Sequence, residues 1–510
     1  MDVGSILERS ASLFPDRPAV IDGDRVISYR ELDERVNRLA NAMLGTGLKP
    51  GDRVIDLQHN AHQYIEADLA LSRAGLVRVP VNTRLTSADW AYIANDSTAR
   101  GLIFGDGFAG PAEELLDCLG GLDVVVGVER GPGLRYETLL AGAAPTPIRT
   151  RRARGELVSI NYSSGTTGRP KGCMRTVGNR LASTVDFLIN LFEGGLTASD
   201  MWLHAGPITH ASGLFVLPHI AVGACQVVMP RFDPIEAARL VAKHHATGTV
   251  WVPTMIERVI AHDLADHDLQ SLRRVAYAGA PMAPDRIRAA NEVLDGRLVQ
   301  FYGMVEAIPP LTVLTQQDHE AHMTDVRLAS AGRQCLSVEL EIVGENGSPM
   351  DAGEVGELVV GGEHVMAGYW GMEEATGKAL RDGRLWTGDM AWRDDDGYIT
   401  IVDRKNDMII SGGYNVYPRE VEDVLKTDPS VGDVVVLGVP DPEWGQAVTA
   451  AVVIKAGAKA DRERLFALCR TNLAQFKRPK RIDFVESIPQ TPAGKTNRKA
   501  LLDMIGNKVG

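Results

Sequence analysis

The sequence predicts an α/β fold: a large N-terminal domain of helix-covered, mostly parallel sheets with a β-rich subdomain, and a small α+β C-terminal domain. Two patterns of apolar residues support this. In the first part of the chain, short apolar runs alternate with helix-length segments, which is typical of parallel strands joined by helices. At 338–360, alternating strands follow one another closely, with Gly and Asn turns and no helix between them.

The apolar runs can be followed along the chain. Residues 29–44 place apolar side chains at helical spacing and predict an early helix. The runs of strand length, separated by helix-length segments, are 54–57, 76–81, 102–104, 124–128, 226–229, 248–252 and 275–277.

A polar segment, 403–407, follows a strand-like run. We predict a domain boundary there, with an N-terminal domain of residues 1–405 and a C-terminal domain of residues 406–510. The elements expected in the C-terminal domain are a helix from Arg419, strands at 434–439 and 450–454, and a helix at 462–473.

Composition excludes several classes of protein. A length of 510 residues with 45% hydrophobic and 24% charged residues indicates two to four globular units. The net charge of −12 disfavours nucleic-acid binding. Five dispersed cysteines without CxxC spacing predict neither disulfides nor a zinc finger, and no export signal or spanning segment is evident. We therefore expect a cytoplasmic protein that binds neither nucleic acid nor a membrane, with its oligomeric state left open.

A loop rich in Gly, Ser and Thr follows the strand-like residues 157–160. Its glycines let backbone N–H groups face an anion, its hydroxyls add neutral donors, and Lys171 adds charge, so it suits a polyphosphate. It is not a Walker A loop, because Lys171 follows Pro170 instead of a glycine. The residues predicted to contact phosphate are Ser163, Ser164, Gly165, Thr166, Thr167, Gly168 and Lys171.

Other patterns carry less weight. The GxGxxG match at 105–110 lacks a βαβ unit with a well-placed acid, and no GxSxG element surrounds Ser163 or Ser164. A set of possible metal ligands is interpreted as an exposed helix face, and its members are His262, Asp263, Asp266 and His267.

With six further motifs, the chain resembles the adenylate-forming superfamily, which includes acyl-CoA synthetases, luciferases and the adenylation domains of peptide synthetases. The motifs follow in the family's order: Gly279-Ala280-Pro281, Tyr302-Gly303-Met304-Val305-Glu306, Trp386-Thr387-Gly388-Asp389, Asp403-Arg404-Lys405, Ser411-Gly412-Gly413 and Pro492-Ala493-Gly494-Lys495. The resemblance implies that ATP activates a small carboxylic acid to an acyl-adenylate with release of pyrophosphate. The CoA thiol then displaces AMP. ATP, Mg²⁺ and CoA are the implied cofactors.

The resemblance also implies roles for individual residues. Residues 1–405 would be the AMP-binding domain, and residues 406–510 a small mobile lid with a hinge near Asn406. This lid would present Lys495 for adenylation and another loop for thioester formation. Glu306 and Thr166 would hold Mg²⁺, and Lys495, Glu306, Thr166 and His210 form the catalytic set. Outside the phosphate loop, the implied nucleotide contacts are Gly279, Ala280, Pro281, Tyr302, Gly303, Met304, Val305, Asp389 and Arg404. The implied CoA contacts are Ser411, Gly412, Gly413 and Tyr414.

The acid itself is not identified by the sequence. His210 matches the family position near the acyl carboxylate. The remaining residues of the acyl pocket implied by the resemblance are Ser212, Trp251, Met255, Ala278 and Gly303, and they suit either an aromatic or a medium aliphatic acid.

Four positions depart from the family pattern, and two alternatives stay open. The departures are Val305 for a threonine, Val177 for a histidine, Asn406 for an acid or lysine, and Cys173 for an aliphatic residue. One alternative is a stand-alone adenylating enzyme that transfers its product to another nucleophile or to a carrier protein, which we expect to act in trans, or that activates another small oxyanion acid. The other is a non-catalytic nucleotide-binding relative. The basic residues expected to contact CoA phosphates or an acidic carrier are Lys477, Arg478, Lys480 and Arg481.

Overall fold

The computed structural model describes residues 2–148, 151–163, 169–262, 268–490 and 496–506. The chain divides into two compact units, and each is described by itself: Met1–Leu340 with Val360–Leu385, and Glu341–Val359 with Trp386–Gly510. The domain boundary predicted between residues 405 and 406 falls inside the second unit and stays a prediction.

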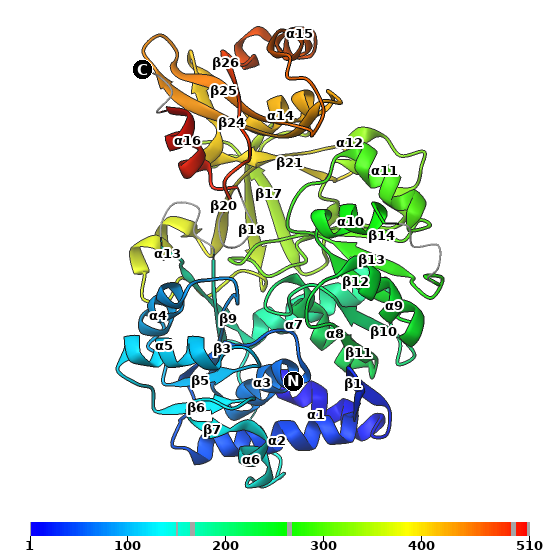
Figure 1. The fold of residues 1–510 in the computed structure, drawn as a ribbon, viewed down its shortest axis with the longest axis vertical. Coiled ribbons are helices and arrows are strands. Elements are labelled where there is room, and N and C mark those ends of the chain that lie inside the picture. The colour runs from blue at the N-terminus through cyan, green and yellow to red at the C-terminus, as the bar shows by residue number, and fades with distance from the viewer. Residues whose placement is uncertain (1, 149–150, 164–168, 263–267, 491–495, 507–510) are drawn as a thin grey trace. The chain divides into compact units, whose positions relative to one another are not determined.

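The first unit contains two helix-covered sheets (Figure 1). In spatial order, the strands of the first sheet are β16 (Arg333–Gln334), β15 (Thr312–Leu314), β14 (Leu298–Tyr302), β13 (Arg274–Tyr277), β12 (Gly248–Trp251), β10 (Met201–His204), β11 (Cys225–Val228), β1 (Pro18–Asp22) and β2 (Arg25–Ser28). The strands from β14 to β1 run parallel, which confirms the predicted strand type.

The second sheet of this unit is also largely parallel. In spatial order, its strands are β7 (Leu134–Arg135), β6 (Val124–Gly127), β5 (Gly101–Phe104), β3 (Arg53–Leu57), β4 (Val77–Pro80), β8 (Leu157–Tyr162) and β9 (Gly172–Thr176). Only the β8–β9 pair among these is antiparallel, so the phosphate loop joins two adjacent strands of a hairpin.

Helices pack against these sheets through their apolar faces. Helix α2 (Tyr29–Gly45) begins where the Ser28 hydroxyl accepts a hydrogen bond from the Glu31 N–H, and its apolar residues at helical spacing are fully buried. Figure 1 shows α9, α10 and α11 beside β10, β12 and β13. The other helices of this unit are α1 (Val3–Leu13), α3 (His62–Ala74), α4 (Ser87–Asp96), α5 (Ala109–Leu119), α6 (Tyr136–Ala141), α7 (Val177–Asp186), α8 (Val216–Val222), α9 (Pro234–His244), α10 (Pro253–Ile260), α11 (Pro284–Val293), α12 (Asp325–Leu328) and α13 (Glu373–Ala379).

Strands occupy the segment 338–360, as predicted, and further strands follow as far as residue 404, with one helix before them. They are β17 (Val338–Val343), β18 (Gly356–Gly362), β19 (Leu380–Arg381), β20 (Arg384–Arg393) and β21 (Ile399–Arg404). Strand β20 pairs antiparallel with β19 and with β21.

The C-terminal part of the second unit is the expected α+β structure. Its sheet has the order β23 (Tyr414–Val416), β22 (Ile409–Ser411), β25 (Gly445–Ile454), β24 (Val431–Asp441), with β26 (Arg481–Phe484) paired to β25. Its helices are α14 (Pro418–Lys426), α15 (Arg462–Asn472) and α16 (Arg498–Gly506). None of the helices in the described ranges combines the length and the apolar composition that crossing a membrane requires.

Candidate active site

Neighbouring parallel strands of the first unit end at one edge, and predicted site residues follow them directly. Trp251 at the end of β12 lies opposite Tyr277 at the end of β13, and Tyr277 lies opposite Gln300 of β14. Segment 278–281 follows β13, and segment 303–306 follows β14. In open α/β sheets the carboxyl ends of the strands form the ligand crevice, so this edge suits a nucleotide and an acyl group.

Two glycines at this edge are required by geometry. Gly279 has φ +89°, a conformation that strains residues with a Cβ. A Cβ added to Gly303 would lie 2.7 Å from Cγ of Pro309. The backbone that follows β13 and β14 can therefore take this course only with glycine at both positions.

Tyr369 lies between two of the predicted charged residues. Its hydroxyl donates a hydrogen bond to Oε1 of Glu306 at 3.1 Å, and the Lys171 ammonium lies 4.9 Å from the centre of its ring. The backbone N–H of Met366 also donates to the carbonyl of Glu306 at 2.8 Å. Sequence reasoning did not find Tyr369, because it lies far from both partners along the chain.

The phosphate loop is described only at its two ends. The N–H of Ser163 donates to the carbonyl of Lys171 at 2.9 Å, which closes the loop above the β8–β9 hairpin. The predicted loop residues outside the described ranges are Ser164, Gly165, Thr166, Thr167 and Gly168. Lys495 and the three residues before it also lie outside these ranges.

In the second unit, Asp389 and Arg404 form an ion pair. They face each other across β20 and β21, with Nε of Arg404 2.7 Å from Oδ1 of Asp389. Asp389 is buried, whereas about half of the Arg404 side chain is exposed. The Asp389 N–H donates to the Thr387 hydroxyl at 3.0 Å, and Thr387 in turn donates to the Leu358 carbonyl at 2.7 Å. This chain of bonds fixes the backbone that carries the carboxylate.

The predicted CoA loop is the turn of the β22–β23 hairpin. Ser411 pairs with Tyr414, and Gly412 and Gly413 between them have φ +58° and +83°, as a two-residue type I′ turn requires. The N–H of Gly412 donates to the carbonyl of Trp444 at 2.9 Å. Tyr414 is 58% exposed, so it can contact a ligand.

Aromatic rings and lysines surround this turn, and the sequence did not single out the rings. Phe476 stacks on Tyr414, with ring centres 4.8 Å apart. The Lys480 ammonium lies 4.3 Å from the centre of a Trp444 ring and has no ion pair among the described residues. Lys477 pairs with Glu420 at 2.7 Å. One exposed ring, Tyr414, and two partly exposed rings beside a lysine offer stacking and charge to a nucleotide-like group.

The two arginines of this basic run have other contacts. Arg478 donates hydrogen bonds to the carbonyls of Leu473 and Arg470, and Arg481 pairs with Asp483 at 2.6 Å. Lys480 is therefore the residue of this run that is best placed to meet a phosphate.

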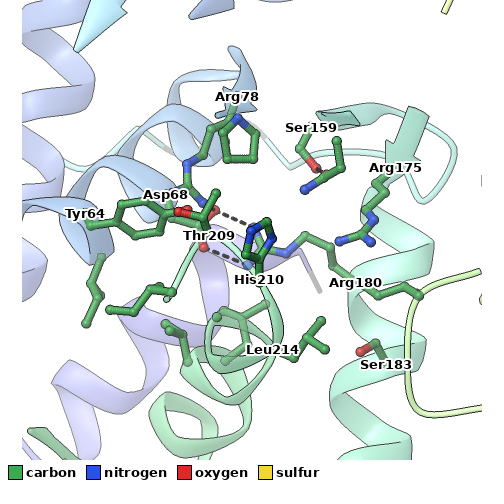
Figure 2. Close-up of a pocket in the computed structure, with 18 of the residues that line it drawn as sticks. Tyr64, Asp68, Arg78, Ser159, Arg175, Arg180, Ser183, Thr209, His210 and Leu214 are labelled. Carbon is green, nitrogen blue, oxygen red and sulfur yellow. Dashed lines mark hydrogen bonds and ion pairs between the residues drawn. The ribbon is translucent and has the colours of Figure 1, made fainter. Parts of the chain in front are cut away.

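His210 lines a cavity of about 60 Å³ in the first unit (Figure 2). Tyr64, Asp68, Arg78 and Arg180 line it from other elements. Asp68 lies 2.9 Å from Arg78 and accepts two hydrogen bonds from Arg180, at 2.8 and 2.7 Å. Burial alone would raise the pKa of Asp68, but the two guanidinium groups outweigh it and lower this pKa to about 2.

The other predicted acyl residues do not line this cavity. The Ser212 hydroxyl is bonded to Nδ1 of His204 at 2.8 Å, and burial lowers the pKa of His204 to about 4. Trp251 and Met255 are buried in the core between the sheet and its helices. Their role as an acyl pocket stays a prediction, together with that of Ala278 and Gly303.

The described residues contain no group of three His, Cys, Asp or Glu side chains that could hold a metal ion. His262 is exposed, and the other members of the set interpreted as a helix face, 263–267, lie outside the described ranges. Two of the positions that depart from the family pattern are buried. Val177 is fully buried at the start of α7. Cys173 is also buried, and burial raises the pKa of its thiol.

Comparison with known proteins identifies the family. The AMP-binding enzyme model matches residues 7–370, and the AMP-binding enzyme C-terminal domain model matches residues 420–495. A feruloyl-CoA synthase from Amycolatopsis sp is 38% identical over 499 residues, which is 97% of each chain. A 2-succinylbenzoate–CoA ligase from Geobacillus kaustophilus is 36% identical over 98% of this chain and 97% of its own.

A solved structure agrees over nearly the whole chain. The amide bond synthetase McbA from Marinactinospora thermotolerans superposes with a TM-score of 0.90 at 30% identity, covering 99% of this chain and 100% of its own. The chain therefore belongs to the AMP-binding enzyme family, as an AMP-forming acyl-CoA ligase.

Proposed function

We propose that ATP binds at the strand-end edge of the first unit and that a carboxylic acid reacts with it there. One carboxylate oxygen attacks the α-phosphorus, and the bond from that phosphorus to pyrophosphate breaks. The CoA thiolate then attacks the acyl carbon, and the bond to AMP breaks. Both steps develop negative charge in the transition state, so fixed cations and hydrogen-bond donors would contribute most to catalysis by stabilising that charge.

One observation carries this proposal: Lys171, Tyr369 and Glu306 lie together in the first unit. Lys171 would neutralise phosphate charge, and Tyr369 would hold the Glu306 carboxylate in place. A single carboxylate fits Mg²⁺, because this ion is usually held by one or two carboxylates together with the phosphates and water. When bound, Mg²⁺ would neutralise the triphosphate, with Glu306 and Thr166 as its protein ligands.

The individual nucleotide roles are carried over from the family resemblance. Gly279, Ala280, Pro281 and Tyr302 would frame adenine at the ends of β13 and β14. Asp389 would accept hydrogen bonds from the ribose hydroxyls, with Arg404 beside it. The remaining contacts proposed along the same edge are Gly303, Met304 and Val305.

The two half-reactions would use different loops of a mobile C-terminal domain that begins near Asn406. Lys495 would stabilise charge between the carboxylate and the α-phosphate during adenylation. The Ser411–Tyr414 turn would receive the pantetheine arm of CoA, and its neighbours Phe476, Trp444 and Lys480 supply stacking surfaces and charge for the nucleotide end.

A second acceptor is favoured by one comparison. McbA is named an amide bond synthetase, and its TM-score to this chain is 0.90. An amine, or a carrier-protein thiol, would then replace CoA in the second step, while the adenylation step stays the same.

The test is pyrophosphate release from ATP and Mg²⁺ with a panel of aromatic and aliphatic acids. Each acid is supplied alone, with CoA and with an amine, and the products are identified by mass. We expect acid-dependent turnover that requires CoA and yields acyl-CoA. Turnover that ignores CoA and yields an amide would select the second acceptor, and the absence of acid-dependent pyrophosphate release would overturn both.

A further inference from the structure

Arg175 is a partly buried guanidinium with no carboxylate partner among the described residues. It extends from β9 and lines the cavity together with Arg180 and His210 (Figure 2). Its Nη2 donates to the carbonyl of Val305 at 3.4 Å, which is a long contact. Its Nε is buried and meets no hydrogen-bond acceptor in the described part of the chain.

The other two arginines of the cavity are paired. Arg78 contacts the carboxylates of Asp56 at 2.6 Å and Asp68 at 2.9 Å, and Arg180 binds Asp68 through two hydrogen bonds. Three guanidinium groups therefore face two carboxylates, and the Glu306 carboxylate acts on Arg175 from a distance without forming an ion pair among the described residues. The guanidinium without a paired carboxylate is that of Arg175.

An uncompensated charge is unfavourable away from water. Burial lowers the pKa of Arg175 to about 10, so the group stays protonated at neutral pH. The protein thus keeps a desolvated cation facing a cavity, and an anion that enters the cavity would compensate the charge of Arg175.

The cavity suits a small polar group. Its volume of about 60 Å³ has room for a few atoms, and its lining includes Ser159, Asn161 and Thr209 beside the charged residues. A long apolar chain would leave the Arg175 guanidinium without a counter-charge. A carboxylate would accept from Arg175 and from the amide N–H groups of Asn161, whose Oδ1 already accepts a hydrogen bond from the Ser159 hydroxyl at 2.8 Å.

We propose that Arg175 is the counter-ion for a carboxylate group of the acid substrate, bound in this cavity beside His210. The inference rests on the proposed function, because it assumes that the substrate is an acid. The carboxylate is either the reacting group or a second acidic group of a dicarboxylic acid. Arg175 contacts Val305, which is next to Glu306 in the chain, so the cavity adjoins the proposed Mg²⁺ ligand.

The test measures acid binding by calorimetry without ATP, using hexanoate with adipate and cinnamate with 4-carboxycinnamate. We expect Arg175→Met to weaken binding of the favoured acid about 10- to 100-fold, as the loss of a charge-assisted hydrogen bond implies. Equal weakening for both members of a pair supports the reacting carboxylate as the bound group. Weakening confined to the dicarboxylic acid supports the second acidic group.

Stability measurements separate this role from a structural one. Arg175→Met removes an unpaired cation, so the unfolding temperature without acid should stay the same or rise. The matched variant Arg180→Met leaves Asp68 with one guanidinium partner fewer and should lower it. Arg175→Lys keeps the charge but not the planar fork, so it should restore part of the acid affinity.

Two results would overturn the proposal: unchanged binding of every acid in Arg175→Met, or a wild-type protein that binds none of them. Pyrophosphate release by the wild type reports separately on the ligase function. Turnover with unchanged acid binding in Arg175→Met would reject only the Arg175 role. Arg175-dependent binding without turnover would reject only the ligase.

Discussion

Asp389 is a buried carboxylate that is already paired with Arg404, so its position is fixed by β20 and β21. Asp68 is also buried, but it lies between the guanidinium groups of Arg78 and Arg180. The first is proposed to serve nucleotide binding and the second serves stability, and substitutions should separate these two effects.

Asp389→Asn keeps the size of the side chain and removes its charge. We expect the KM for ATP to rise about tenfold, because a charge-assisted hydrogen bond to ribose is weakened. The kcat should change much less, since ribose contacts are made in the ground state and the transition state alike. Steady-state kinetics with varied ATP measure both, with the exposed Asp395→Asn as control. An unchanged KM for ATP would reject the ribose role.

Asp68→Asn should lower the free energy of unfolding by about 3–5 kcal/mol at neutral pH, because buried guanidinium groups lose a partner. The pKa of Asp68 is about 2 in the folded protein and about 3.9 in an unfolded chain. Its stabilising contribution is therefore complete above about pH 4 and is lost as the pH falls toward about 2.

Urea unfolding at a series of pH values tests this sign. The wild type should lose about 2 kcal/mol more stability than Asp68→Asn between about pH 5 and about pH 2. If the two proteins lose stability in parallel, Asp68 does not carry this pH dependence.

At the scale of elements, the β22–β23 turn offers a local test of the thioester step. A Cβ added to Gly412 would lie 3.0 Å from the Trp444 ring, whereas one added to Gly413 would meet no atom within 4 Å. Gly412→Ala should therefore shift the turn and slow acyl transfer to CoA about tenfold, as about 1–3 kcal/mol of strain implies.

Single-turnover measurements of each half-reaction check this, because adenylation should change far less. Gly457→Asn is the matched control outside the turn, since Gly457 has φ +80°, asparagine tolerates a left-handed backbone, and a Cβ at this position would meet no atom within 4 Å. Equal slowing of both half-reactions by Gly412→Ala would mean that the turn does not act in thioester formation.

Much of the fold was predictable because strand and helix periodicity are local. The runs 102–104 and 275–277 lie within β5 and β13, and the helix predicted at 29–44 is α2. β10 was not predicted, because MWLH is short and ends in a histidine. Its burial depends on strands that lie far away in the sequence.

The site was predictable where it is a motif and not where it depends on long-range contacts. The motifs placed Asp389 and Arg404 in one site, and the structure pairs them. Tyr369 and Arg175 carry no local signal. Tyr369 reaches Glu306 only because segments far apart in the sequence fold together. Arg175 faces a cavity whose lining comes from several other elements.

At the scale of the whole molecule, the proposed reaction depends on residues spread along most of the chain. Lys495→Ala should abolish adenylate formation, with a loss of about 100-fold or more, because a cation at the developing charge is removed. Thioester formation from supplied acyl-adenylate should change less than about threefold, as that step would use another loop. The exposed Lys499→Ala is the control. Equal loss in both half-reactions would reject the lid assignment.

The edge where β12, β13 and β14 end has a consequence for protein engineering. Residues within these strands are buried and fix the sheet, whereas those that follow them would meet the ligand. A mutant library restricted to the positions after the strands, with Gly279 and Gly303 kept, would vary the proposed ligand contacts while sparing the core, so more of its members should fold than in a library of equal size spread over the strands.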